Sequence, residues 1–74
     1  MSRLPSLTAK QVLKALKRGG FVPSHQSGSH LYLEHPKTGH ATTVPMHPGE
    51  LKRWLLKEIV KQAGLSEDAF RELL

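Results

Sequence analysis

Residues 28–35 contain the side chain best suited to chemistry. A small turn leads into His30, and apolar and polar residues then alternate as in a β-strand. Successive side chains of a strand point to opposite faces, so His30 and Tyr32 should share one face and Leu31 and Leu33 the other. The leucine face can be buried under helices. His30 would then lie on a rigid strand, open to water and ligands.

A histidine in this position suits acid–base chemistry, because the ordinary pKa of an imidazole is about 6.5. Cleavage of RNA needs this chemistry. The 2′-hydroxyl loses a proton as it attacks the adjacent phosphate, the leaving 5′-oxygen gains one, and cations stabilise the added negative charge. Gly28 and Ser29, directly before His30, allow a ligand to approach the backbone closely. We therefore expect His30 to be a general acid or base, with no metal needed.

The chain has five histidines, which raises the question of a metal site. His25, His30, His35 and His40 recur every five residues, and His47 follows seven residues later. A catalytic zinc site needs three converging protein ligands, and a five-residue spacing across strands and turns does not readily converge. We expect no metal and no cofactor. For most of these histidines the plain interpretation is a surface side chain.

Other catalytic arrangements have little support in the sequence. There is no cysteine, and no glycine-rich phosphate-binding loop. The few carboxylates before residue 63 are widely scattered, which disfavours a catalytic carboxylate pair. Ser29 and His30 are neighbours whose side chains should point to opposite faces of a strand, so a Ser–His nucleophile pair is disfavoured.

A first helix is expected to begin at a capping box. Thr8 and Gln11 have the Thr-x-x-Gln spacing in which each residue satisfies a backbone N–H of the other. Apolar residues then recur at helical spacing as far as Arg18. Gly19 and Gly20 supply the stop.

Three strands should follow, over residues 21–26, 30–35 and 41–44. Pro23 has no N–H to donate, which favours an edge position for the first of them. Residues 36–39 have the Pro and Gly of a β-turn, so the strands form an antiparallel meander.

A second helix is predicted over residues 50–63, ended by Gly64, and Ser66 should cap a short last helix. The order α-β-β-β-α-α indicates an α+β fold with helices on one face of a three-stranded antiparallel sheet. This is the layout of a double-stranded-RNA-binding-like domain. At 74 residues, we expect residues 1–74 to form a single domain.

The net charge of +5 and the pI of about 10.0 favour a polyanionic partner, although a solubilising surface is the plain alternative. Arg71 is the only Lys or Arg after Ala63, whereas Glu67, Asp68 and Glu72 all follow it, so the body of the chain is cationic. No apolar run is long enough for a membrane span. We expect a soluble cytoplasmic protein.

The chain resembles the HicA-type mRNA interferase toxins, also called the YcfA-like family, over roughly residues 7–70. The landmarks that carry this resemblance are Lys10–Leu16, Gly20-Phe21, Gln26-Ser27-Gly28-Ser29-His30, His35-Pro36, Val44-Pro45-Met46-His47 and Ile59–Ser66. Each landmark is weak alone, but their order and separation are fairly specific. The resemblance implies a double-stranded-RNA-binding-like fold, ribosome-independent cleavage of mRNA, a catalytic histidine at His30, and a HicB-type antitoxin as partner.

Three positions depart from the family pattern. His25 and Ser27 stand where the family often has basic residues, and Trp54-Leu55 stands where the second helix usually opens with Gly-Thr. Fewer cations beside His30 would weaken RNA affinity or alter sequence choice. We expect Trp54 to pack at the start of the helix rather than to stack on a base.

The leading hypothesis is a toxin of a type II toxin–antitoxin system that acts as a metal-independent endoribonuclease. His30 is the expected catalytic residue. The expected RNA-binding residues are Gly28, Ser29, Tyr32, Lys37, Arg53 and Lys57. His47, framed by two prolines, is expected to fix its loop.

Two other functions are compatible with the same fold. A non-catalytic RNA-binding module would bind RNA in a salt-sensitive way without cutting it. A protein that only holds a partner on its open sheet face would show no RNA affinity at moderate salt.

Overall fold

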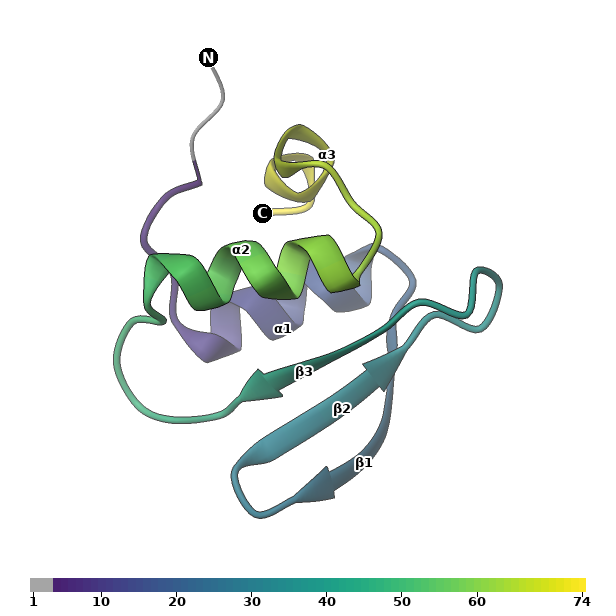
Figure 1. Ribbon diagram of the computed structural model, residues 1–74, viewed down its shortest axis with the longest axis horizontal. Coiled ribbons are helices and arrows are strands. Elements are labelled where there is room, and N and C mark those ends of the chain that lie inside the picture. The colour runs from purple at the N-terminus through teal and green to yellow at the C-terminus, as the bar shows by residue number, and fades with distance from the viewer. Residues whose placement is uncertain (1–3) are drawn as a thin grey trace.

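The computed structural model describes residues 4–74, and it has the element order α-β-β-β-α-α. Figure 1 shows the strands as one layer and the two longer helices as a second layer on one face of the sheet. The predicted α+β class and element order are confirmed. The elements are α1 (Ala9–Arg18), β1 (Val22–Ser27), β2 (His30–Glu34), β3 (Ala41–Pro45), α2 (Arg53–Gln62) and α3 (Glu67–Glu72).

Helix α1 begins at the predicted capping box. The backbone N–H of Gln11 donates to the hydroxyl of Thr8 at 3.3 Å, and the N–H of Thr8 donates to the Gln11 side chain at 2.9 Å. Both bonds satisfy donors that a helix start leaves unpaired. The helix buries Val12 and Leu16 against the sheet and ends at Arg18, as predicted.

The sheet has the order β1-β2-β3, with both pairs antiparallel. On the face toward the helices, Leu33 pairs with Thr42 and Leu31 with Val44. Leu33, Thr42 and Val44 are buried. The predicted alternation of β2 is therefore confirmed, and Pro23 lies on an edge strand as expected.

Strand β1 contains one residue that β2 does not match. Pro23 pairs with Leu33 and His25 pairs with Tyr32, so Ser24 is the extra residue of a β-bulge. Its hydroxyl donates to the carbonyl of Tyr32 at 3.2 Å. Between the bulge and the β1–β2 turn the pairing is regular, which places His25 on the same open face as Tyr32.

The prediction that the second helix begins at Glu50 is wrong: α2 begins at Arg53. The residues before it are used in tertiary pairing instead. Glu50 forms an antiparallel bridge with Thr8, and the N–H of Leu51 donates to the carbonyl of Leu7 at 2.8 Å. These bonds hold the chain extended until Arg53.

The expectation that Trp54 packs at the helix start is also wrong, because this side chain is 67% exposed. The buried residues of α2 are Leu56, Ile59 and Val60. Trp54 precedes Leu56 by two positions, a rotation of about 200° around a helix. It therefore lies on the opposite side from the core.

Helix α3 closes the far side of the helical layer. Ser66 caps it as predicted, accepting the N–H of Ala69 at 3.0 Å. Phe70 is 0% exposed and belongs to the same buried cluster as Leu16 and Leu33. Among the helices within residues 4–74, none is long and apolar enough to cross a membrane.

Candidate active site

The turn before His30 is a two-residue hairpin loop formed by Gly28 and Ser29, with Ser27 paired to His30 across it. Gly28 has φ +60°, and the space where a Cβ would lie is open. A glycine at the first loop position, with a positive φ there and not at Ser29, is typical of a type II′ turn. The twist of this turn matches the twist of the two strands of a hairpin. The amide of Gln26 donates to the Gly28 carbonyl at 3.0 Å and fixes the turn.

His30 is exposed at the start of β2, on the face that the helices leave uncovered. It is held between β1 and β3, where it pairs with Ser27 and Pro45. Within residues 4–74, no hydrogen bond occupies either ring nitrogen of His30. The strand thus fixes the position of an imidazole whose nitrogens are free to meet a ligand.

A second histidine lies beside His30. The ring centroids of His30 and His47 are 6.4 Å apart, with an interplanar angle of 81°. His47 Nε2 lies 3.4 Å from the hydroxyl of Ser29, and the N–H of Met46 donates to the Ser29 carbonyl at 2.6 Å. The loop after β3 is thereby joined to the β1–β2 turn. The expected loop-fixing role of His47 fits the Ser29 contact, but the position beside His30 was not predicted.

Tyr32 and His25 form a stacked pair on the same open face. Their ring centroids are 4.3 Å apart and their planes are nearly parallel, at 8°. Tyr32 is 36% exposed, so this aromatic pair is open to solvent, two residues along β2 from His30.

The remaining two histidines have structural contacts. His35 Nδ1 accepts the N–H groups of Lys37 and Thr38 at 3.2 and 3.3 Å, which holds the β2–β3 turn. His40 Nδ1 lies 3.0 Å from the Thr38 hydroxyl, and its ring covers Gly64 so closely that a Cβ there would lie 2.6 Å from it. In the part of the chain that the structure describes, no three His, Asp or Glu side chains gather closely enough to hold a metal ion.

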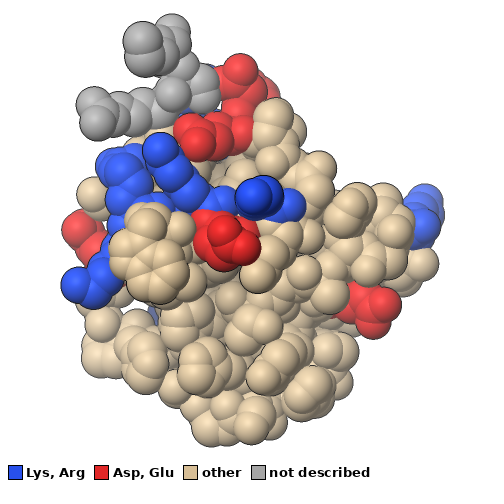
Figure 2. Space-filling model, in the orientation of Figure 1, with Lys and Arg blue, Asp and Glu red and all other residues tan. Residues whose placement is uncertain are grey.

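The predicted cationic residues do not gather around His30. Lys37 follows β2 at the end opposite His30, and the five residues of the strand span about 13 Å. Arg53 donates to the carbonyl of Leu4 at 2.6 Å and so ties down the N-terminal segment. Lys57 is exposed on α2, in the helical layer. Figure 2 agrees: blue side chains gather over the helices, and the lower part of the view, over the strands, is tan.

A cleft of about 400 Å³ adjoins His47 and brings a different lysine to this end of the molecule. It lies between the start of α1 and the loop after β3, and it contains Lys10. The residues that line it are Thr8, Ala9, Lys10, Met46, His47, Pro48 and Gly49. The start of a helix also contributes partial positive charge. Lys10 and His47 are therefore candidate site residues beyond those predicted from the sequence.

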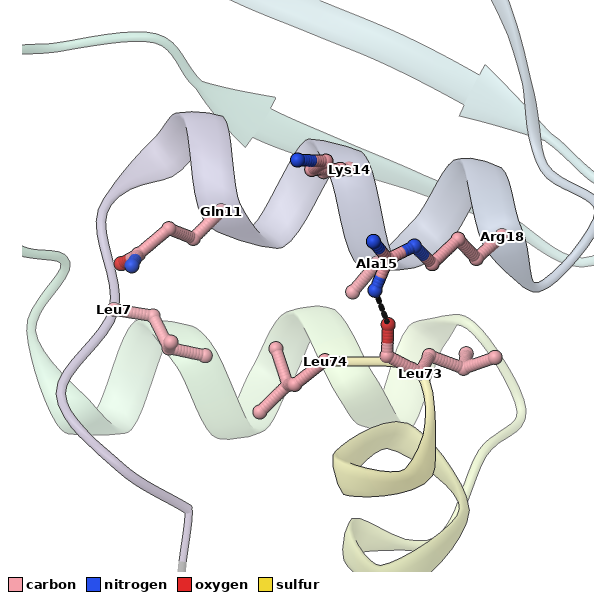
Figure 3. Close-up of a pocket in the computed structure, with 7 residues that line it drawn as sticks. All are labelled: Leu7, Gln11, Lys14, Ala15, Arg18, Leu73 and Leu74. Atoms are coloured by element: carbon pink, nitrogen blue, oxygen red, sulfur yellow. Dashed lines mark hydrogen bonds between the residues drawn. The ribbon is translucent and has the colours of Figure 1, made fainter.

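Another hollow, of about 250 Å³, lies away from the histidines between α1 and the C-terminal residues. Figure 3 shows Arg18 reaching across it to Leu73, whose carbonyl accepts a hydrogen bond from the guanidinium at 3.1 Å. Its lining is largely apolar and includes Leu7 and Leu74. It contains no acid–base pair.

The fold and the site define a small basic α+β domain with an exposed histidine pair on its uncovered sheet face. Residues 9–65 match the model of the HicA toxin family of bacterial toxin–antitoxin systems, and the chain belongs to that family. It is thus a toxin whose partner is an antitoxin. No curated protein matches the chain in a sequence comparison.

Proposed function

We propose that this toxin is a metal-independent endoribonuclease that cleaves mRNA, and that a HicB-type antitoxin inhibits it. One observation carries the proposal: His30 is exposed on a strand of the open sheet face, with a second imidazole 6.4 Å away between ring centroids. Membership of a toxin family supports the same conclusion.

The reaction requires proton transfer at two oxygens. The 2′-hydroxyl gives up its proton and bonds to phosphorus, and the bond from phosphorus to the 5′-oxygen breaks as that oxygen takes a proton. The products are a 2′,3′-cyclic phosphate and a 5′-hydroxyl. His30 serves as acid or base in this step, and its free ring nitrogens allow it to reach the substrate.

The stacked pair of Tyr32 and His25 is the proposed base-binding surface. A nucleobase stacked on an aromatic side chain contributes about 1–3 kcal/mol with little dependence on sequence. His25 stands where the family often has a basic residue, and its ring instead stacks on Tyr32, with 4.3 Å between centroids. Gly28 and Ser29 lie next to His30, and the open space beside Gly28 can admit the RNA backbone.

Lys10 is the proposed phosphate-binding cation nearest the site, because it lines the cleft beside His47. Lys37 and Lys57 are exposed but lie on other parts of the molecule, so only a longer RNA strand would reach them. Arg53 already donates to the Leu4 carbonyl, and its proposed contact with RNA uses the remaining N–H groups.

The antitoxin is proposed to cover the open sheet face. That face presents His30 and Tyr32 without a covering helix, so a partner placed there would exclude RNA from the site.

Incubation of the purified protein with RNA in excess chelator tests the function directly. We expect shortened RNA that ends in 2′,3′-cyclic phosphate and 5′-hydroxyl groups, because no step needs a metal ion. Denaturing gels and end-specific enzymatic labelling give the readout. Salt-sensitive RNA binding without scission would instead indicate a non-catalytic RNA-binding module, and no binding at moderate salt would indicate a protein that only holds a partner.

The substitution Lys10→Gln should weaken RNA binding and its salt dependence. One phosphate contact fewer reduces the slope of log Kobs against log salt by about 0.7 for single-stranded RNA. The measurement is a salt titration with 2′-O-methylated RNA, which lacks the attacking hydroxyl and stays intact. Lys61→Gln, in the last turn of α2, is the matched control. Equal slopes for the two variants would remove Lys10 from the interface.

A further inference from the structure

We propose that His47 is the second proton-transfer group of the reaction, acting with His30 on opposite sides of one phosphodiester. This inference rests on the proposed ribonuclease function and deepens it. It assigns a chemical role to a residue for which the sequence indicated only a part in fixing a loop.

The separation of the two rings fits this role. Their centroids are 6.4 Å apart. Acid and base groups that act on the two sides of one bond are about 5–10 Å apart in glycoside hydrolases, where the geometry is well defined. Hydrogen bonds of about 2.8 Å from two such rings can converge on different oxygens of one phosphate. Because the two ring planes lie at 81° to each other, the nitrogens of His30 and His47 can contact different oxygens of the phosphate.

The position of His47 is set by two independent attachments to the His30 strand. His30 pairs with Pro45, two residues before His47, in the β2–β3 ladder. The N–H of Met46 donates to the carbonyl of Ser29, whose hydroxyl lies 3.4 Å from His47 Nε2. The loop therefore cannot move away from the strand without breaking backbone bonds. Catalytic groups need this kind of support to stay in productive geometry.

The surroundings also favour a histidine pair over other partners for His30. The strands contribute no Lys or Arg, and Glu34, the only carboxylate of β2, is at the opposite end of that strand. The cleft on the other side of His47 holds Lys10, which suits the negative charge of a bound phosphate. Among the described side chains, His47 is the titratable group that lies next to His30.

A substrate with an altered leaving group tests the proposal. First, a cleavage site is mapped on an oligoribonucleotide. The same RNA is then made with sulfur in place of the bridging 5′-oxygen at that site. A thiolate leaves without being protonated, because its conjugate acid is much stronger than an alcohol. Loss of the general acid therefore slows the oxygen substrate but has little effect on the sulfur substrate, whereas loss of the general base slows both.

The variants are His30→Gln and His47→Gln, with His40→Gln as a control that removes an imidazole at the other end of β2. We expect His30→Gln and His47→Gln each to lose about 10²–10⁴-fold on the oxygen RNA. One of the two should recover on the sulfur RNA and the other should not, and the one that recovers is the acid. The control should match the wild type on both, and thermal melts confirm that each variant is folded.

Two results would overturn the role of His47. One is wild-type cleavage of the oxygen RNA by a folded His47→Gln protein. The other is recovery of both variants or of neither, since a residue that only supports the fold would slow both substrates alike. Failure of the proposed function looks different, because the wild-type protein itself would then leave both RNAs intact.

Discussion

The substitution His30→Ala is expected to abolish RNA cleavage and growth inhibition while leaving the protein folded. General acid–base catalysis by one positioned side chain contributes about 10²–10⁴-fold. The ring is exposed and, within residues 4–74, makes no hydrogen bond, so its removal should change the free energy of unfolding by no more than about 0.5 kcal/mol. Single-turnover cleavage rates and urea denaturation measure the two quantities.

Glu34→Gln is the matched control, because Glu34 lies on the same strand and the same open face at the far end from His30. It should cleave RNA at a rate close to that of the wild type. Cleavage at the wild-type rate by a well-folded His30→Ala protein would show that another residue performs the proton transfer.

The substitution Phe70→Ala is expected to produce the largest loss of stability. Phe70 is 0% exposed and fills the core beneath α3, beyond residues 9–65 that match the family model. Truncating a buried phenylalanine costs about 3–5 kcal/mol. Small domains are stable by only about 5–15 kcal/mol in total, so this loss is a large fraction. Chemical denaturation followed by circular dichroism gives the free energy of unfolding.

Arg71→Ala is the control that distinguishes the loss of a buried side chain from a general disturbance of α3. Arg71 is paired with Asp68 at 2.8 Å, but both side chains are largely exposed. Such pairs contribute less than about 1 kcal/mol. If Phe70→Ala were no more destabilising than Arg71→Ala, α3 would not be part of the cooperative core.

The helix cap, the strands and the turns could be predicted because they depend on local chemistry. The capping box at Thr8 and the alternation around Leu33 were confirmed. The start of α2 was mispredicted because Glu50 and Leu51 bond to the segment before α1, which is distant in sequence. The error over Trp54 has a related cause, since the helical face that it occupies depends on which residues of α2 are buried.

The exposed position of His30 followed from strand alternation, but its neighbour did not. His47 reaches His30 through the register of β2 with β3, and the sequence contains a signal for that register. The turn around Pro36 pairs His35 with His40, and continuing the ladder from that pair places His30 opposite Pro45. Extending the predicted turn in this way would have located the histidine pair.

The stacking of His25 on Tyr32 was not predicted, although the two-residue turn sets it: with Ser27 opposite His30, regular pairing places His25 opposite Tyr32. Without the bulge, Ser24 would pair with Leu33 and Pro23 with Glu34, so the bulge changes the placement of the residues before it and not that of His25. The bulge itself, one extra residue in an edge strand, was not predicted from the sequence.

Ser24 therefore reverses the alternation of side-chain directions along β1. Residues before it and residues after it follow opposite odd–even rules for which side they face. Deleting this serine would make the pairing of β1 with β2 regular throughout while leaving His25 opposite Tyr32. The pairing of His25 with Tyr32 is thus set by the two-residue length of the Gly28–Ser29 turn, whereas the extra serine sets which side Val22 and Pro23 face.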